Sequence, residues 1–254
     1  MSIDTLEEIK DFTSRLTANE LSLDEKLESK AQGALFNFSN SLPIRNLAAN
    51  IPEEEKLIIL TDIVGFSKST TRQQVYKIYL FQRYIMSQVL TSRFSFTGKI
   101  RIHNFVPTGD GCYMVADKCD PESAINFLIK LVSGIKNVCD DEGASISIRA
   151  SALIGSVVPF LDLERHKNFV GEGMNEASRI LSGGQSVLEE KFRAENPEKT
   201  VSEAKLFSRN TIYLGKGLME SAEDFKDRCT SFHQFKNVSD KHGMKRDITV
   251  LQGL

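Results

Sequence analysis

Two aspartates that each follow a strand-like apolar run carry the strongest chemical signal in the sequence. Residues 57–60 lead to Asp62 and then to a turn marked by Gly65, and a second run leads to Asp110, which glycines flank on both sides. Hard divalent cations such as Mg²⁺ and Mn²⁺ prefer carboxylate oxygen and fill the rest of their coordination shell with water and substrate phosphates. The two aspartates therefore predict a metal site for a nucleoside triphosphate. Their alternative role is to cap backbone amides in two turns.

The segments around these aspartates alternate between strand and helix patterns. After the first strand, residues 69–90 contain few helix breakers and predict a long helix. Two strands joined by the Asp110 turn follow, and then a helix capped by Asp120 and Pro121. An apolar alternation from residue 145 predicts another strand. This order of elements predicts an α+β fold with a ferredoxin-like βαββαβ core.

The segment after this core is expected to open with a helix. It starts near Gly171 and is predicted to end at residues 182–184, where paired glycines favour a helix C-cap. A separate helix is then expected near 186–195. The rest of the chain predicts strands near 205–213, 230–238 and 247–251.

The first 50 residues carry apolar side chains at helical spacing, including Ile3, Leu6 and Ile9. We therefore expect two domains, an N-terminal helical extension over 1–50 and a catalytic domain over 51–254. The apolar stripe of the extension has three possible uses: it packs on its own domain, extends a dimer interface, or binds a partner.

Composition and charge argue against two classes of protein, those that bind nucleic acid and those that span a membrane. With 254 residues, a net charge of −2 and a pI near 6.1, the chain has no basic surplus of the kind that nucleic-acid binding requires, so we expect no nucleic-acid partner. No apolar run is long enough to span a membrane, and the first residues are acidic, so we expect a cytoplasmic protein. The cysteines lack metal-binding spacing and are expected to be free thiols; they are Cys112, Cys119, Cys139 and Cys229.

Three stretches, in order, resemble the motifs of the class III nucleotide cyclases. The first metal motif of that family is matched by Leu60-Thr61-Asp62-Ile63-Val64-Gly65-Phe66-Ser67, and its Gly-Asp hairpin by Gly109-Asp110. A third block is matched by Gly171-Glu172-Gly173-Met174-Asn175-Glu176-Ala177-Ser178-Arg179. The resemblance covers about residues 56–185 and implies the same ferredoxin-like core.

The resemblance implies a two-metal reaction, in which the ribose 3′ hydroxyl attacks the α-phosphate and expels pyrophosphate. Asp62 and Asp110 would hold two divalent ions, Mg²⁺ or Mn²⁺, with the Ile63 carbonyl as a further ligand. Asn175 would orient the ribose, and Arg179 would stabilise charge on the α-phosphate. The turn residues Gly65, Phe66 and Ser67 would bind the triphosphate.

The family places the metal pair and the Asn/Arg pair on opposite subunits. The resemblance therefore implies a homodimer with two composite sites, in which Asn175 and Arg179 serve the partner. The lysine that binds the triphosphate is expected to be Lys241, with Lys245 as the second choice, since residues 238–243 resemble the corresponding family element. A solvated lysine is the alternative.

Two positions depart from the family pattern. Where relatives carry the pairs that recognise adenine or guanine, this chain has Val106 and Asn168. Asn168 has both a donor and an acceptor and can pair with uracil or cytosine. Bulky residues on the first long helix would favour the smaller pyrimidine ring, and the candidates are Tyr76, Tyr79 and Tyr84, although core packing is their simpler role.

A chain that has the cyclase motifs but neither of the purine-recognising pairs resembles the pyrimidine cyclases of bacterial anti-phage signalling, the Pycsar class. This resemblance implies that cUMP or cCMP is made from UTP or CTP and activates a separate effector. Two alternatives stay open. One is an atypical adenylate cyclase that makes cAMP, and the other is a cyclase-like domain that binds a nucleotide and regulates without catalysis.

Overall fold

The computed structural model describes residues 51–94, 100–135, 146–161, 167–239 and 243–253. The predicted extension over 1–50, together with Cys139 and Lys241, lies outside the described residues. Residues from Glu53 onward belong to one compact unit, which ends at Leu254. In the part of the chain that is described, no helix is both long enough and apolar enough to cross a membrane.

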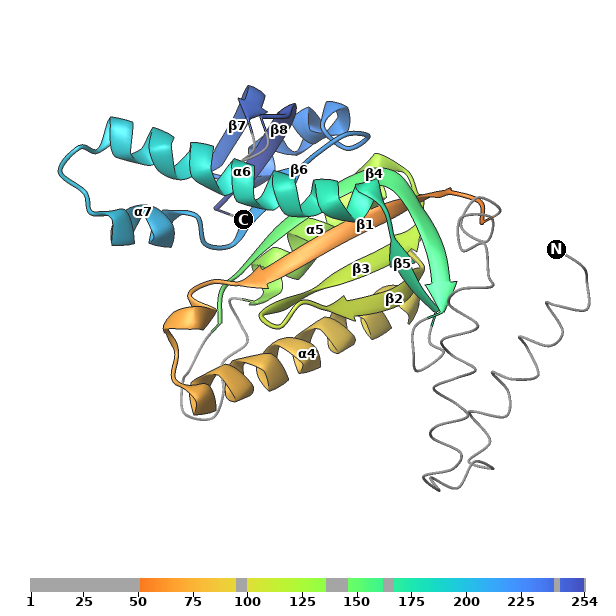
Figure 1. Ribbon diagram of the computed structural model, residues 1–254. Helices are drawn as coiled ribbons and strands as arrows, with labels where there is room; N and C mark the ends of the chain where they lie inside the picture. The colour runs from red at the N-terminus through yellow and green to blue at the C-terminus, as the bar shows by residue number, and fades with distance from the viewer. Residues whose placement is uncertain (1–50, 95–99, 136–145, 162–166, 240–242, 254) are drawn as a thin grey trace, which may run out of the picture. The chain divides into compact units, whose positions relative to one another are not determined.

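One eight-stranded sheet organises this unit (Figure 1). Its strand order is β2-β3-β1-β4-β6-β8-β7, and β5 pairs with β4 outside this path. The pairings are antiparallel except for that of β4 with β6. The strands are β1 (Glu54–Ile63), β2 (Ile102–Pro107), β3 (Gly111–Asp117), β4 (Ile148–Leu161), β5 (Lys167–Val170), β6 (Thr211–Leu214), β7 (Ser231–Ser239) and β8 (Lys245–Gln252).

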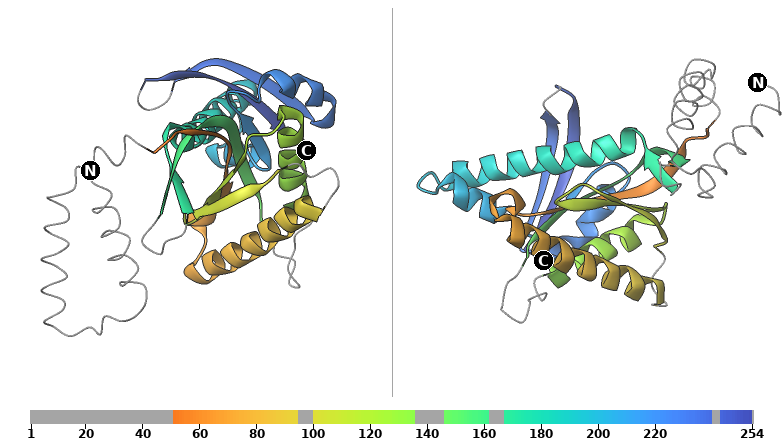
Figure 2. Two further views of the ribbon diagram at one scale, coloured as in Figure 1. Left: turned by 90° about the vertical axis from the view of Figure 1, so that its right-hand side faces the viewer. Right: turned by 60° about the horizontal axis from the view of Figure 1, so that its bottom comes forward.

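Helices cover both faces of the sheet, as the two views in Figure 2 show. The helices α4 (Thr71–Phe94) and α5 (Pro121–Gly134) lie on one face, and α6 (Glu172–Glu195) lies on the other. A short helix, α7 (Val201–Phe207), follows α6. Within the described ranges, two 3₁₀ segments complete the regular structure, η1 (Phe66–Lys68) and η3 (Glu220–Arg228). The predicted α+β class and the βαββαβ order of the core are confirmed.

The middle of the inner strand β1, residues 57–60, is apolar because both of its sides are buried. Leu57 and Ile59 pack with α4 and α5, whereas Ile58 and Leu60 pack with α6. Each of these four side chains is at most 6% exposed. The period of two along the strand therefore decides which face each residue reaches.

The helices α4 and α5 are positioned by apolar packing, by the cap of α5 and by a hydrogen bond between the two helices. The Asp120 side chain accepts from the Ser123 backbone N–H at 2.8 Å, and Pro121 occupies the first turn, which confirms the predicted cap of α5. On α4, the buried Tyr84 hydroxyl donates to the Leu131 carbonyl of α5 at 2.7 Å. This bond ties the two helices together.

The prediction that a helix ends at residues 182–184 was wrong. The helix α6 runs unbroken through Gly183 and Gly184 to Glu195, so the separate helix expected at 186–195 is its second half. A Cβ at position 184 would lie 2.4 Å from the Tyr213 ring of β6. Gly184 therefore permits close packing of the helix against the sheet, and it does not mark a helix end.

The prediction of a strand at 205–213 was also wrong in part. Its first residues belong to α7, and only Thr211–Leu214 form a strand, β6. The last two predicted strands correspond to β7 and β8, with boundaries shifted by a few residues. The long helix expected at 69–90 is α4.

Candidate active site

The structure brings Asp62 and Asp110 together at one end of the sheet. In the β1–β3 register Asp62 lies opposite Gly111, and the Ile63 backbone N–H donates to the Asp110 carbonyl at 2.8 Å. A Cβ on Gly111 would lie only 1.9 Å from the Thr61 carbonyl oxygen, so only glycine allows the turn to approach β1 this closely. The glycine beside Asp110 is thus what lets the two carboxylates meet.

Arg149 lies beside Asp62 and belongs to the same cluster, and the sequence analysis missed it. It lies opposite Asp62 in the β1–β4 register, and its Nη2 donates to the Asp62 carboxylate. The Arg149 side chain is 13% exposed, and its buried Nε has no hydrogen-bond partner among the residues that the structure describes. The available signal was a charged residue inside the predicted strand, between Ile148 and Ala150.

The electrostatics of this cluster favour a bound cation. Burial raises the pKa of Asp62, and the neighbouring Asp110 carboxylate adds to the rise, whereas the Arg149 guanidinium opposes it. Arg149 pairs with Asp62, and the Asp110 carboxylate lies near Asp62, so the cluster has an acidic surplus that fits a divalent ion. Among the described residues no three His, Cys, Asp or Glu side chains form a metal-binding group. A metal ion at Asp62 and Asp110 therefore requires further ligands from substrate and water, which Mg²⁺ commonly uses.

The turn that follows Asp62 is open to solvent. Gly65 has a left-handed φ of 71°, which glycine adopts without strain, and it precedes the 3₁₀ turn η1, which starts at Phe66. Gly65 and Ser67 are exposed, and Phe66 packs partly against the core. The predicted triphosphate turn is therefore accessible next to the aspartates.

The predicted catalytic pair lies on the first turns of α6. Asn175 is exposed and the Arg179 side chain is 26% exposed, so both are on the outward side of a helix whose inward side carries Met174 and Ala177. The metal pair instead lies at the ends of β1 and β3. The two halves of the predicted catalytic set thus occupy different elements of the chain.

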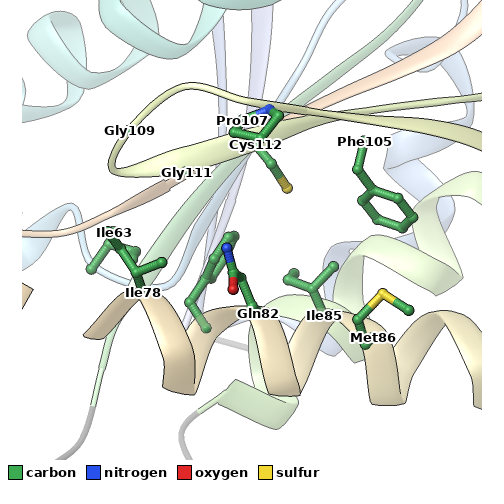
Figure 3. A pocket seen from close by; sticks show the side chains of 11 residues that line it. Ile63, Ile78, Gln82, Ile85, Met86, Phe105, Pro107, Gly109, Gly111 and Cys112 are labelled. Atoms are coloured by element: carbon green, nitrogen blue, oxygen red, sulfur yellow. The ribbon is translucent and has the colours of Figure 1, made fainter. Parts of the chain in front are cut away.

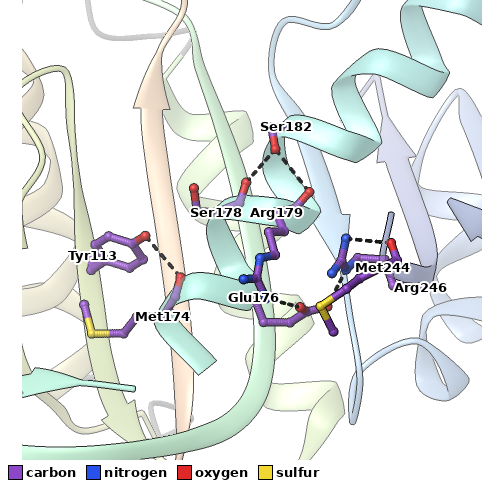
Figure 4. A network of polar contacts seen from close by, with 8 residues as sticks. All are labelled: Tyr113, Met174, Glu176, Ser178, Arg179, Ser182, Met244 and Arg246. Atoms are coloured by element: carbon purple, nitrogen blue, oxygen red, sulfur yellow. Dashed lines mark hydrogen bonds and ion pairs between the residues drawn. The ribbon is translucent and has the colours of Figure 1, made fainter. Parts of the chain in front are cut away.

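A polar network surrounds Arg179 (Figure 4). The Glu176 carboxylate accepts from Arg246 Nε on β8 at 2.6 Å and lies 3.9 Å from Arg179 Nη1. The Tyr113 hydroxyl of β3 donates to the Met174 carbonyl at 3.1 Å and fixes the start of α6 to the sheet. Glu176 therefore links the two arginines and couples α6 to β8.

The two predicted base-recognition positions lie on neighbouring strands. Val106 is on β2, on the sheet face that α6 covers, and Asn168 is on β5. Asn104, which the sequence analysis did not single out, connects these strands. Its Nδ2 donates to the Lys167 carbonyl at 2.5 Å and lies 3.5 Å from Asn168 Oδ1.

Within one chain, the tyrosines that were expected near the base do not lie beside Val106 and Asn168. Tyr76 and Tyr79 are 38% and 69% exposed on α4, which covers the opposite face of the sheet. Tyr84 is buried, and its hydroxyl is bonded to α5, so it serves in packing. Lys245, the second choice for the triphosphate, is exposed at the start of β8.

A cavity lies behind the Asp110 turn, between α4 and the β2–β3 hairpin (Figure 3). Its volume is about 520 Å³, and its walls are mainly apolar, with Phe105 and Cys112 from the hairpin facing Ile85 and Met86 from α4. None of the described residues that line it has a charged side chain. The lining includes neither aspartate of the cluster nor Arg149, so this cavity is not the candidate active site.

Comparison with solved structures identifies the fold. The catalytic core of a rhodopsin-guanylyl cyclase with converted specificity, in complex with ATPαS, matches with a TM-score of 0.53 and 18% sequence identity over 81% of this chain and 99% of that chain. The guanylate cyclase domain of RhGC from Catenaria anguillulae, in complex with GTP, matches with a TM-score of 0.52 and 18% identity over 80% and 98%.

A bacterial structure gives the same result. The adenylate/guanylate cyclase/hydrolase from Silicibacter pomeroyi matches with a TM-score of 0.51 and 14% identity over 81% of this chain and all of the other. No protein-family model matches the chain, and neither does any curated protein. The chain therefore has the fold of the catalytic domains of class III nucleotide cyclases.

Proposed function

We propose that the protein is a metal-dependent nucleotide cyclase, which converts a nucleoside triphosphate to its 3′,5′-cyclic monophosphate and pyrophosphate. The observation that carries this proposal is the Asp62, Asp110 and Arg149 cluster on a cyclase fold. A structural pair of turn aspartates would need neither a mutual approach that raises a pKa nor a buried arginine with an unused donor.

The side chains of the cluster have separable roles. Asp62 and Asp110 hold two divalent ions, Mg²⁺ or Mn²⁺, with the Ile63 carbonyl as a further ligand. When bound, these ions supply activation of the 3′ hydroxyl and neutralise the leaving pyrophosphate. Arg149 orients the Asp62 carboxylate and offers its remaining donors to a phosphate oxygen, while Gly65, Phe66 and Ser67 contact the triphosphate.

The active enzyme in this proposal is a homodimer. Asn175 and Arg179 are on the outward side of α6, where a second subunit can reach them. In the dimer Asn175 orients the ribose bound at the partner's aspartates, and Arg179 stabilises the charge that develops on the α-phosphate. Lys241 or Lys245 adds a positive charge at the triphosphate.

The proposed substrate is a pyrimidine nucleoside triphosphate, UTP or CTP. Support comes from Val106 and Asn168, which replace the residue pairs that recognise adenine or guanine in related cyclases. The product, cUMP or cCMP, then acts as a second messenger in bacterial anti-phage defence and activates a separate effector.

The direct test is to incubate purified protein with Mn²⁺ and each of ATP, GTP, CTP and UTP, and to resolve the products by mass. We expect a cyclic pyrimidine nucleotide, and we expect Asp62→Asn and Asp110→Asn to abolish it without loss of fold. A cyclic purine product would refute the pyrimidine assignment and leave the cyclase assignment intact. Turnover that survives in both variants would refute the two-aspartate mechanism.

A further inference from the structure

The two asparagines that bridge β2 and β5 form a small recognition element beside Val106. In the β2–β3 register Asn104 lies opposite Val115 and Val106 lies opposite Tyr113, and both partners belong to the cluster on the α6 face. Asn104 and Val106 therefore point to the same face of the hairpin. Asn168 reaches this pair from β5, where its Oδ1 lies 3.5 Å from the Asn104 Nδ2.

The backbone fixes which way the Asn168 carboxamide points. The Phe169 backbone N–H donates to Asn168 Oδ1 at 2.8 Å. A backbone N–H can only meet an acceptor, so the oxygen faces the strand and the NH₂ group faces away. Asn104 has the same arrangement, because its Oδ1 accepts from the Phe105 N–H at 2.8 Å.

The acceptor oxygen of Asn168 is thus directed to the protein. Asn104 Nδ2, held by the Lys167 carbonyl, lies 3.5 Å from the same oxygen and occupies its second side. The NH₂ of Asn168 donates to none of the residues that the structure describes. What Asn168 presents outward is therefore a hydrogen-bond donor in a fixed orientation.

We propose that Asn168, held by Asn104 and the Phe169 backbone, selects bases that carry a carbonyl oxygen at the ring position where cytosine carries its amine, so that UTP is preferred over CTP. The inference rests on the proposed function, because it takes Asn168 to contact the base. Uracil offers the O4 acceptor at the position where cytosine carries an amine. An amine that meets a fixed NH₂ leaves two donors without an acceptor, and such unsatisfied groups are costly.

The same rule predicts the order within the purines. Guanine carries O6 where adenine carries an amine, so any residual purine turnover favours GTP over ATP. Selection by this element is therefore independent of ring size, which Val106 and its surroundings control.

The test is a change of one atom at a fixed position. In Asn168→Asp, one carboxylate oxygen keeps the bond from Phe169, and the other replaces the outward NH₂ by an acceptor. We expect the wild type to have a kcat/KM for UTP at least tenfold above that for CTP, and the variant to lower this ratio at least tenfold. Asn104→Ala, which removes one of the two constraints, is expected to lower the ratio by a smaller factor.

A charge control separates recognition from electrostatics. Asn126 on α5 accepts from Arg228 through its Oδ1 at 2.5 Å, and Asn126→Asp adds the same charge away from the site. It is expected to leave the UTP to CTP ratio unchanged. Wild-type preference for CTP, or a ratio that Asn168→Asp leaves within threefold of the wild type, overturns the inference while cyclase activity stands.

If no product forms, the inference can still be tested by measuring how tightly the protein binds UTP and CTP. Dissociation constants for UTP and CTP, measured by calorimetry with Ca²⁺, are expected to show the same order and the same inversion in Asn168→Asp. That pattern without turnover would support the inference and refute the proposed catalysis. Equal affinities, or no binding of either nucleotide, would refute the inference.

Discussion

The two faces of the sheet are built from the same strands but carry different chemistry. Toward α4 and α5 the strands present a continuous apolar surface, with an apolar cavity behind the Asp110 turn. Toward α6 the strands also carry the paired Asp62 and Arg149, and two asparagines bridge β2 and β5. Two adjacent residues of one strand can therefore have different roles, one in stability and one in function, because neighbouring side chains point to opposite faces.

The strongest test of this contrast is Arg149→Met on the α6 face. Arg149 supplies the guanidinium at the aspartates, so its removal is expected to lower kcat/KM about 10²-fold, as for the loss of one oriented donor in other active sites. The assay and thermal unfolding are both run with saturating Mg²⁺, which offsets the lost positive charge. Activity within threefold of the wild type would show that Arg149 is only structural.

A matched glycine pair tests the packing of α6 itself. Gly184→Ala places a Cβ against the Tyr213 ring and is expected to lower the free energy of unfolding by about 1–3 kcal/mol. The neighbouring Gly183→Ala meets Val238 at 3.4 Å, an ordinary contact, and is expected to be neutral or to stabilise the helix by up to about 1 kcal/mol. Chemical denaturation measures both, and equal effects would contradict the close-packing argument.

On the other face, Tyr84→Phe is expected to affect stability alone. Burial raises the pKa of Tyr84 to about 12, so its hydroxyl stays protonated and donates to the Leu131 carbonyl. Loss of this bond is expected to lower the free energy of unfolding by about 1 kcal/mol, with kcat and KM unchanged. A changed preference among nucleotides would instead restore Tyr84 as a base-recognition residue.

The smallest expected effect is the pH dependence that Asp62 contributes without divalent ions. Its folded-state pKa is raised, so the folded protein binds more protons than the unfolded chain between the ordinary value, about 4, and the raised one. The contribution of Asp62 to stability is therefore fully present below pH 4 and is lost as the pH rises through the folded-state pKa. The melting temperature of the wild type minus that of Asp62→Asn is expected to fall over this range, and a rise would contradict the raised pKa.

Local patterns were enough to predict the core of the fold and the aspartate pair. The run before Asp62, the glycines beside Asp110 and the Asp120 cap each depend on residues close in sequence. The βαββαβ order followed from these elements. The roles of Lys241 and of residues 1–50 stay predictions, because these residues lie outside the described part of the chain.

What the sequence did not reveal depends on contacts between distant strands. Arg149 meets Asp62 only through the β1–β4 register, and Asn104 meets Asn168 only because β5 lies beside β2. Gly184 looked like a helix end because the Tyr213 ring that requires it comes later in the chain. In each case the role of the residue depends on a contact with a residue distant in sequence, which no local pattern identifies.

The central position of β1 also has a consequence for how the chain folds. Leu57 pairs with Ala116 on one side and with Ile154 on the other, so both neighbours of this strand come from much later segments. Contacts of such long sequence separation form slowly, and the apolar residues 57–60 stay exposed until β3 and β4 arrive. The strand that delivers Asp62 to the candidate active site is therefore also a segment at risk of aggregation during folding.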